Sequence, residues 1–239
     1  MYEYESRIGF SRCDANGRLS LAGLIDMLQD CSTFQSEDLG VGFRVLEKEH
    51  LAWVINYWDL EITGFPDMCE SVVVGTFPYG LRGFLANRNF YMKDKDDNFL
   101  VKANTMWTLL DMQTVKPVKV PEDIASAYTL EDKLDMEYGS RKIVIPQDCS
   151  QITEEMHITV GNMHLDGNKH VNNGQYVKLA LAAVEGKYDV SGCKRFKIEY
   201  RRQALLGSII CPKIYCGEDY CIVSLNDEDE QPFAVVEIR

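Results

Sequence analysis

Residues 164–177 read HLDGNKHVNNGQYV, a polar turn that leads directly into a helix. Within it, residues 166–173 collect one acid, three asparagines and one histidine: Asp166, Asn168, His170, Asn172 and Asn173. The run YVKLALAAVEG at 176–186 is hydrophobic on most faces of a helix. Because a helix that is apolar all round is buried, we expect this run inside a core, with Gly186 ending the helix.

The first half of the chain carries a weaker echo of this stretch, DANGRLSLAG at 14–23. Both copies place D-x-N ahead of a helical run, and Ser20 is a good N-cap for the first one. Only the second copy has a histidine, since Arg18 stands where the first copy would hold it. Segments rich in β-branched and aromatic residues surround both helices and predict strands. These segments are 4–10, 51–62, 70–77, 83–92 and 98–112, then 141–146, 194–202, 207–216, 220–225 and 232–238.

The repeated order of strand, helix and several strands indicates a duplication. Between the halves, residues 114–140 hold two prolines and many charges. We expect a crossing linker there, with a short helix.

Composition limits the classes of function. The 239 residues carry a net charge of −12, which argues against nucleic-acid binding because phosphates require a basic surface. No apolar run reaches the roughly 18 to 20 residues of a membrane span. The segment MYEYESRIGF lacks the pattern of a signal peptide, so we expect a cytoplasmic protein.

The eight cysteines predict neither a metal site nor a disulfide framework. No pair has C-x-x-C spacing, so we expect no metal, and in a reducing compartment the cysteines are small buried hydrophobes with free thiols. Cys216 and Cys221 could face each other across a hairpin, but we expect no disulfide between them.

Several quoted segments together resemble one family, the acyl-ACP thioesterases of bacteria and plants. The segment LDGNKHVNN is similar to the family's Asp-x-Asn-x-His-Val-Asn-Asn segment, and EYRRQ at 199–203 is similar to its Glu-Tyr-Arg-Arg-Glu segment. In the first half, NYWDLEI, TFPYGL and WTLLDMQTVKPVKVPED resemble the strand ends and crossover of the same family. The likeness extends over about residues 3–238.

The resemblance implies an α+β tandem (double) hot-dog fold, in which each half is an antiparallel sheet wrapped around a long central helix. Residues 1–135 would form the N-terminal hot-dog domain, which binds the acyl chain and includes the crossover linker from about residue 113. Residues 136–239 would form the C-terminal domain with the catalytic residues. Trp53, Trp58, Phe84 and Phe90 could line an acyl tunnel in the first half, although each is more commonly a core residue.

The implied activity is release of free fatty acid from acyl carrier protein, without a cofactor. Hydrolysis of a thioester needs a positioned water, a proton acceptor and donors for the oxyanion. His170 is the natural acceptor. Asp166 or Asn168 could orient its ring, and Asn172 and Asn173 lead into a helix N-terminus that suits the substrate carbonyl.

The sequence departs from the family pattern at two positions. Gln203 stands where the family usually has a glutamate of the catalytic network, and a glutamine orients water but cannot accept its proton. Either His170 is then the only base or another acid, such as Glu199, substitutes. Ala204 replaces the cysteine that is common in the plant branch, which excludes a cysteine nucleophile at that place.

The implied partner is acyl carrier protein with its acyl-phosphopantetheine; the oligomeric state stays open, with a homodimer allowed. Alternation along a strand would place Arg195, Lys197 and Arg201 on one face, where they could dock the acidic carrier. Three alternatives remain: a thioesterase acting on coenzyme A esters, a dehydratase with an Asp/His site, and a non-catalytic acyl-carrier-binding hot-dog protein.

Overall fold

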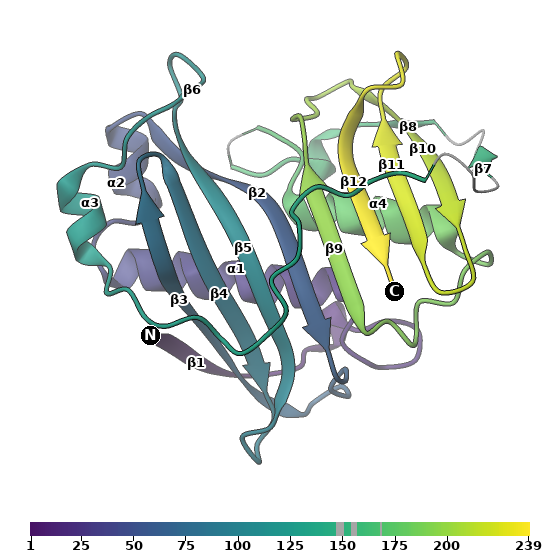
Figure 1. The fold of residues 1–239 in the computed structure, drawn as a ribbon, viewed down its shortest axis with the longest axis horizontal. Helices are drawn as coiled ribbons and strands as arrows, with labels where there is room; N and C mark the ends of the chain where they lie inside the picture. Colours follow the sequence, from purple (N-terminus) through teal and green to yellow (C-terminus); the bar gives the residue numbers. More distant parts are fainter. Residues whose placement is uncertain (147–150, 154–156, 168) are drawn as a thin grey trace. The chain divides into compact units, whose positions relative to one another are not determined.

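The computed structural model describes residues 1–146, 151–153, 157–167 and 169–239, and it divides the chain into two compact units, Met1–Tyr138 and Gly139–Arg239 (Figure 1). In each unit one long helix lies against an antiparallel sheet. This is the α+β arrangement of two hot-dog units that the sequence predicts.

In the first unit the strands pair in the order β1–β3–β4–β5–β2, all antiparallel, and β6 adds to β5. The strands are β1 Tyr2–Arg7, β2 Leu51–Ile62, β3 Ser71–Arg82, β4 Leu85–Lys93, β5 Phe99–Asp111 and β6 Lys116–Pro117. The helices are η1 Phe10–Arg12, α1 Leu21–Asp38, α2 Phe43–Lys48 and α3 Glu122–Ala127, the last being the short helix expected in the linker.

Helix α1 begins where the sequence predicts it. The Oγ of Ser20 accepts a hydrogen bond from the Gly23 amide at 3.0 Å and so caps the helix. The side of α1 toward β3 is buried along its length, and near its C-terminal end it carries the polar residues Ser32 and Gln35. This helix and the sheet therefore enclose the core of the first unit.

The linker lies over the opposite face of the same sheet. The side-chain oxygen of Asn89, a fully buried residue of β4, accepts hydrogen bonds from the Leu134 amide at 3.2 Å and from the Tyr138 hydroxyl at 2.9 Å. The Glu131 amide donates to the Pro78 carbonyl at 3.1 Å. These contacts, made to β3 and β4, fix the crossing segment against the first unit (Figure 1).

In the second unit the order is β9–β12–β11–β10–β7, again antiparallel, with β8 beside β10. The elements are β7 Gln151–Thr153, β8 Ile158–Thr159, η2 Asn162–His164, α4 Asn173–Val184, β9 Arg195–Tyr200, β10 Ile209–Cys216, β11 Cys221–Asn226 and β12 Pro232–Ile238. Gly186, at a φ of 72°, ends α4 as expected, and the Lys187 amide donates to the Val184 carbonyl.

The structure corrects three local predictions. Residues 141–146 are not a strand, although Ile143 is buried. Residues 78–82, which lie between two predicted strands, continue β3, and an irregularity between Pro78 and Gly80 accommodates the proline within the strand. The strand expected at 194–202 is shorter, because β9 ends at Tyr200.

A disulfide joins Cys216 and Cys221, contrary to our expectation. The two residues lie directly opposite each other on β10 and β11, with their Cα atoms 4.2 Å apart, so the short hairpin brings the sulfurs together. Five other described cysteines are free: Cys13, Cys31, Cys69, Cys193 and Cys211. Across the described ranges, no helix has both the length and the apolar character that crossing a membrane requires.

Candidate active site

The segment before α4 is folded by its own polar groups. The Asp166 amide donates to the His170 carbonyl at 2.9 Å, and the Lys169 amide donates to the Asp166 carbonyl at 3.0 Å. The Asp166 carboxylate also accepts from the His170 amide at 3.3 Å. Asp166 therefore holds the backbone of the turn that presents His170, whose side chain is half-buried. Asn168 lies outside the described residues.

Asn172 is the N-cap of α4. Its side-chain oxygen accepts from the Gly174 amide at 2.8 Å, which uses one of the unpaired donors at the helix start. Asn173 is the first residue of the helix, and its carbonyl accepts from the Tyr200 hydroxyl at 3.2 Å. The two asparagines thus lie at the positive end of the helix dipole, with the Asn172 oxygen already engaged.

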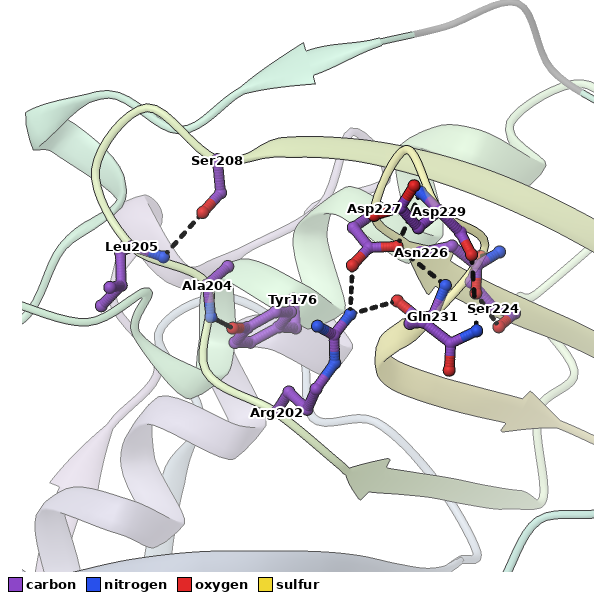
Figure 2. Close-up of polar contacts among 10 residues, drawn as sticks. All are labelled: Tyr176, Arg202, Ala204, Leu205, Ser208, Ser224, Asn226, Asp227, Asp229 and Gln231. Atoms are coloured by element: carbon purple, nitrogen blue, oxygen red, sulfur yellow. Dashed lines mark hydrogen bonds and ion pairs between the residues drawn. The ribbon is translucent and has the colours of Figure 1, made fainter. Parts of the chain in front are cut away.

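Ala204 connects three parts of the second unit. Its amide donates to the Tyr176 hydroxyl on α4 at 2.9 Å, and its carbonyl accepts from the Val171 amide at 3.2 Å (Figure 2 shows the bond to Tyr176). Ala204 is fully buried, and burial raises the pKa of Tyr176, which keeps the phenol a neutral hydroxyl. His170 immediately precedes Val171, and Gln203 immediately precedes Ala204. The hydrogen bond between Val171 and Ala204 therefore holds the backbone next to His170 beside the backbone next to Gln203.

Gln203 lies in a loop after β9 and is exposed. The amides of Arg201 and Arg202 both donate to the Phe233 carbonyl, at 2.8 and 3.1 Å, which is the pattern of a bulge. This irregularity ends the regular strand pairing at Tyr200, but the Arg201 side chain still contacts Glu199, which shares its face of β9 with Lys197.

Arg202 anchors the same loop to the β11–β12 turn (Figure 2). Its guanidinium donates to the Asp227 carboxylate and to the Gln231 carbonyl, both at 2.6 Å, and lies over the Phe233 ring. Hydrogen bonds from the Gln231 amide and, next in size, from the Arg202 side chain lower the pKa of Asp227. The lowered pKa favours the ionised carboxylate that pairs with Arg202. The backbone that precedes Ala204 is therefore fixed from two sides.

Glu199, the acid that could substitute for the missing family glutamate, is already engaged in structural contacts. Its carboxylate accepts from the Ile143 amide at 3.0 Å and from Arg201 at 2.8 Å. On the same face of β9, Lys197 stands opposite Glu237 of β12, and Arg195 exchanges backbone hydrogen bonds with Arg239. The three candidate docking residues therefore have two acids, Glu199 and Glu237, as neighbours. Glu199 forms an ion pair with Arg201 and so offsets its charge.

The remaining groups near the turn are structural. The His164 Nδ1 accepts from the Gly161 amide at 2.9 Å, and its carbonyl accepts from the Asn172 amide. Sequence reasoning missed Tyr176, Tyr200 and Arg202, which position the site. The available signals were the nearness of Tyr176 to the helix start and the place of Tyr200 and Arg202 in the EYRRQ segment. No group of three His, Cys, Asp or Glu side chains capable of holding a metal occurs in the described part of the chain.

Comparisons with known proteins agree with this architecture. A family model described as the acyl-ACP thioesterase N-terminal domain matches residues 1–128, and one described as the C-terminal domain matches residues 148–230. None of the curated proteins matches the sequence.

Three solved structures share the fold. A protein described as an oleoyl thioesterase from Lactobacillus plantarum is 24% identical, with 99% of this chain and 94% of that chain covered and a TM-score of 0.85. An acyl-ACP thioesterase from Bacteroides thetaiotaomicron is 21% identical, covering 99% and 96%, with a TM-score of 0.85. A 12:0-ACP thioesterase from Umbellularia californica is 16% identical, covering 100% and 96%, with a TM-score of 0.84. This likeness, which spans both units, confirms the double hot-dog fold.

The bond between Tyr176 and Ala204 makes a testable contribution to stability. Tyr176→Phe leaves a buried amide without its acceptor, which we expect to lower the free energy of unfolding by about 1–3 kcal/mol. Urea unfolding measures the loss, and faster hydrogen exchange of the Ala204 amide locates it. As a control, Tyr220→Phe removes a half-buried hydroxyl and should cost less than about 0.5 kcal/mol. Equal effects of the two variants would contradict the role given to Tyr176.

Proposed function

From the premise that the chain belongs to the acyl-ACP thioesterase family and is a thioester hydrolase, we propose that His170 activates the water that cleaves acyl-ACP. The observation that carries this proposal is the hydrogen bond between Val171 and Ala204. It holds the segment of His170 against the segment of Gln203, although these residues are far apart in the sequence.

Each polar group in the segment then has a distinct role. His170 takes a proton from water, since histidine exchanges protons near neutrality and Gln203 cannot accept one. Gln203 orients the same water. Asp166 positions His170 through the backbone bond to its amide. Asn168 is proposed to orient the imidazole ring or the substrate carbonyl.

The chemical steps balance without a cofactor. Hydroxide forms as His170 takes the proton, attacks the thioester carbonyl and gives a tetrahedral oxyanion. The start of α4, with the side-chain NH₂ of Asn172 and the helix end at Asn173, stabilises that negative charge. Collapse of the intermediate breaks the carbon–sulfur bond, and His170 returns its proton to the phosphopantetheine thiolate. The products are a fatty acid and the free carrier thiol.

The two units divide the work, with residues 1–135 binding the acyl chain and 136–239 performing the chemistry. Trp58 and Phe90 are fully buried inside the first unit, which supports an interior chain site. Phe84 is 44% exposed, and Trp53 packs instead against a cluster that includes Leu46 of α2 and Ile124 of α3. These latter two residues are therefore poor candidates for the tunnel wall.

The carrier is proposed to dock on Arg195, Lys197 and Arg201, close to Gln203 in the sequence. The net charge of −12 opposes an acidic partner, so a local basic surface has to supply the attraction. Among the described residues, five cysteines are free, which supports a cytoplasmic location. Thiol release measured on matched carrier-protein and coenzyme A esters tests the function, and binding without release would instead favour a non-catalytic binding protein.

His170→Ala should lower turnover by about 100-fold or more, because the general base is lost. The comparison is His157→Ala, which replaces an exposed histidine outside the proposed site and should retain full turnover. Steady-state hydrolysis of acyl-ACP measures both. Retention of more than half the turnover in His170→Ala would exclude His170 as the base.

Gln203→Ala should slow hydrolysis because the attacking water loses its orientation. Gln203→Glu should be tolerated or faster, since a carboxylate both orients water and accepts its proton. Because Gln203 is exposed, both variants should keep the unfolding midpoint of the parent. If Gln203→Ala matches the parent in a steady-state assay, the glutamine has no part in the reaction.

Salt tests the docking surface, since the Debye length falls from about 10 Å at 0.1 M to about 3 Å at 1 M. We expect kcat/KM for acyl-ACP to fall as salt rises, and Arg195→Glu to lower it at low salt. Lys95→Glu, in the exposed turn between β4 and β5, changes the net charge equally and should have little effect. A neutral pantetheine thioester should be nearly indifferent to both. Equal effects of the two variants would show that overall charge, not this surface, governs association.

A further inference from the structure

The inner face of the first sheet, which packs on α1, holds a buried cation. Arg88 of β4 is 8% exposed, and its Nη1 donates to the Gln35 side-chain oxygen at 2.5 Å and to the Thr76 hydroxyl at 3.1 Å. The rings of Phe90 and Tyr128 flank the guanidinium, with centroids 5.9 and 5.4 Å from its central carbon. Burial lowers the pKa of Arg88 to about 10, so the group stays charged at neutral pH.

This cation is incompletely satisfied by the protein. A buried charge is normally paired, and a guanidinium has five N–H donors to satisfy. Only Nη1 is engaged, and both of its acceptors are neutral. Within residues 1–146 and the other described ranges, no carboxylate forms an ion pair with Arg88, and its Nε and Nη2 have no acceptor.

A second, independent donor on the same face is also without a partner. Trp58 of β2 is fully buried, and its indole Nε1–H has no acceptor among the residues that the structure describes. Trp58 and Arg88 both pair with Thr105 of β5, one from each side, so all three share a face of the sheet. The Phe90 ring contacts Trp58, with centroids 4.8 Å apart, and also faces the guanidinium.

The Trp58 donor, left over in the core, requires an acceptor from outside the chain, and the unpaired Arg88 Nε and Nη2, which are not fully buried, are open to the same acceptor. An unsubstituted alkyl chain supplies none, and burying it against a guanidinium without an acceptor is unfavourable. A hydroxyl or keto oxygen on the chain would accept from these donors at no cost in charge.

We propose that Trp58 and Arg88 form a polar subsite for an oxygen substituent on the acyl chain, which makes them specificity-determining residues. The proposal rests on the proposed function, in which the first unit holds the acyl chain. It specifies the substrate class as an oxygenated acyl chain, with a hydroxyl or keto group that reaches the inner face of β2 and β4.

A positional series tests this subsite. Acyl-ACP substrates of one chain length, each with a hydroxyl at a different carbon, are compared with the unsubstituted chain. At one position we expect kcat/KM to exceed that of the plain chain by about tenfold or more, the scale of one hydrogen bond to a charged group. Trp58→Phe and Arg88→Met should each bring this ratio toward one.

The matched control is Trp53→Phe, which should keep the ratio because Trp53 packs on the cluster around Leu46 and Ile124. Arg88→Met could fail to fold, since Arg88 ties α1 to β3. Trp58→Phe keeps an aromatic ring and therefore carries the test alone in that case.

Two results would overturn the subsite. One is a ratio near one at every position in the parent enzyme, and the other is an unchanged ratio in Trp58→Phe, as expected if only a bound water meets the indole. In both cases hydrolysis of the plain chain would still support the proposed function. Absence of hydrolysis for every acyl-ACP would overturn the proposed function itself, and this inference with it.

Discussion

The candidate site depends on the backbone of one buried residue, Ala204. Its amide bonds to Tyr176 on α4, and its carbonyl bonds to Val171 at the end of the polar turn. Two hydrogen bonds therefore hold the loop at Ala204 against the distant stretch from Val171 to Tyr176, in a place that water does not reach. Because a buried amide without an acceptor is costly, the loop after β9 has little freedom to leave this position. His170 and Gln203 owe their proximity to that constraint.

Most polar groups around the site are occupied in building it. Asp166 closes the turn, Asn172 caps the helix, and Glu199 holds the segment of Ile143. Arg202 fixes the loop after β9 to the β11–β12 turn. The proposed chemistry falls to the half-buried His170 and the exposed Gln203. Under the proposed function His170 alone moves the proton, so the reaction does not need a second base at Gln203.

Sequence alone predicts the elements whose signals are local. The Ser20 cap, the strands at 51–62 and 232–238 and the Gly186 stop each depend on a few neighbouring residues. The features it misses arise from contacts between distant segments: the bulge opposite Phe233, the hydrogen bond of Tyr176 with Ala204, and the strand-free segment around Ile143. The disulfide falls between these cases, because the cysteine spacing suggests a hairpin but does not fix the register that places Cys216 opposite Cys221.

The central claim is that His170 and Gln203 act on the same water. The most direct measurement is kcat/KM of the double variant His170→Ala/Gln203→Ala, compared with the two single variants in a double-mutant cycle. Residues that act as a unit are strongly non-additive, so the double variant should be about as slow as His170→Ala alone. If the two losses instead multiply, the residues act independently, and the account of a shared water is wrong.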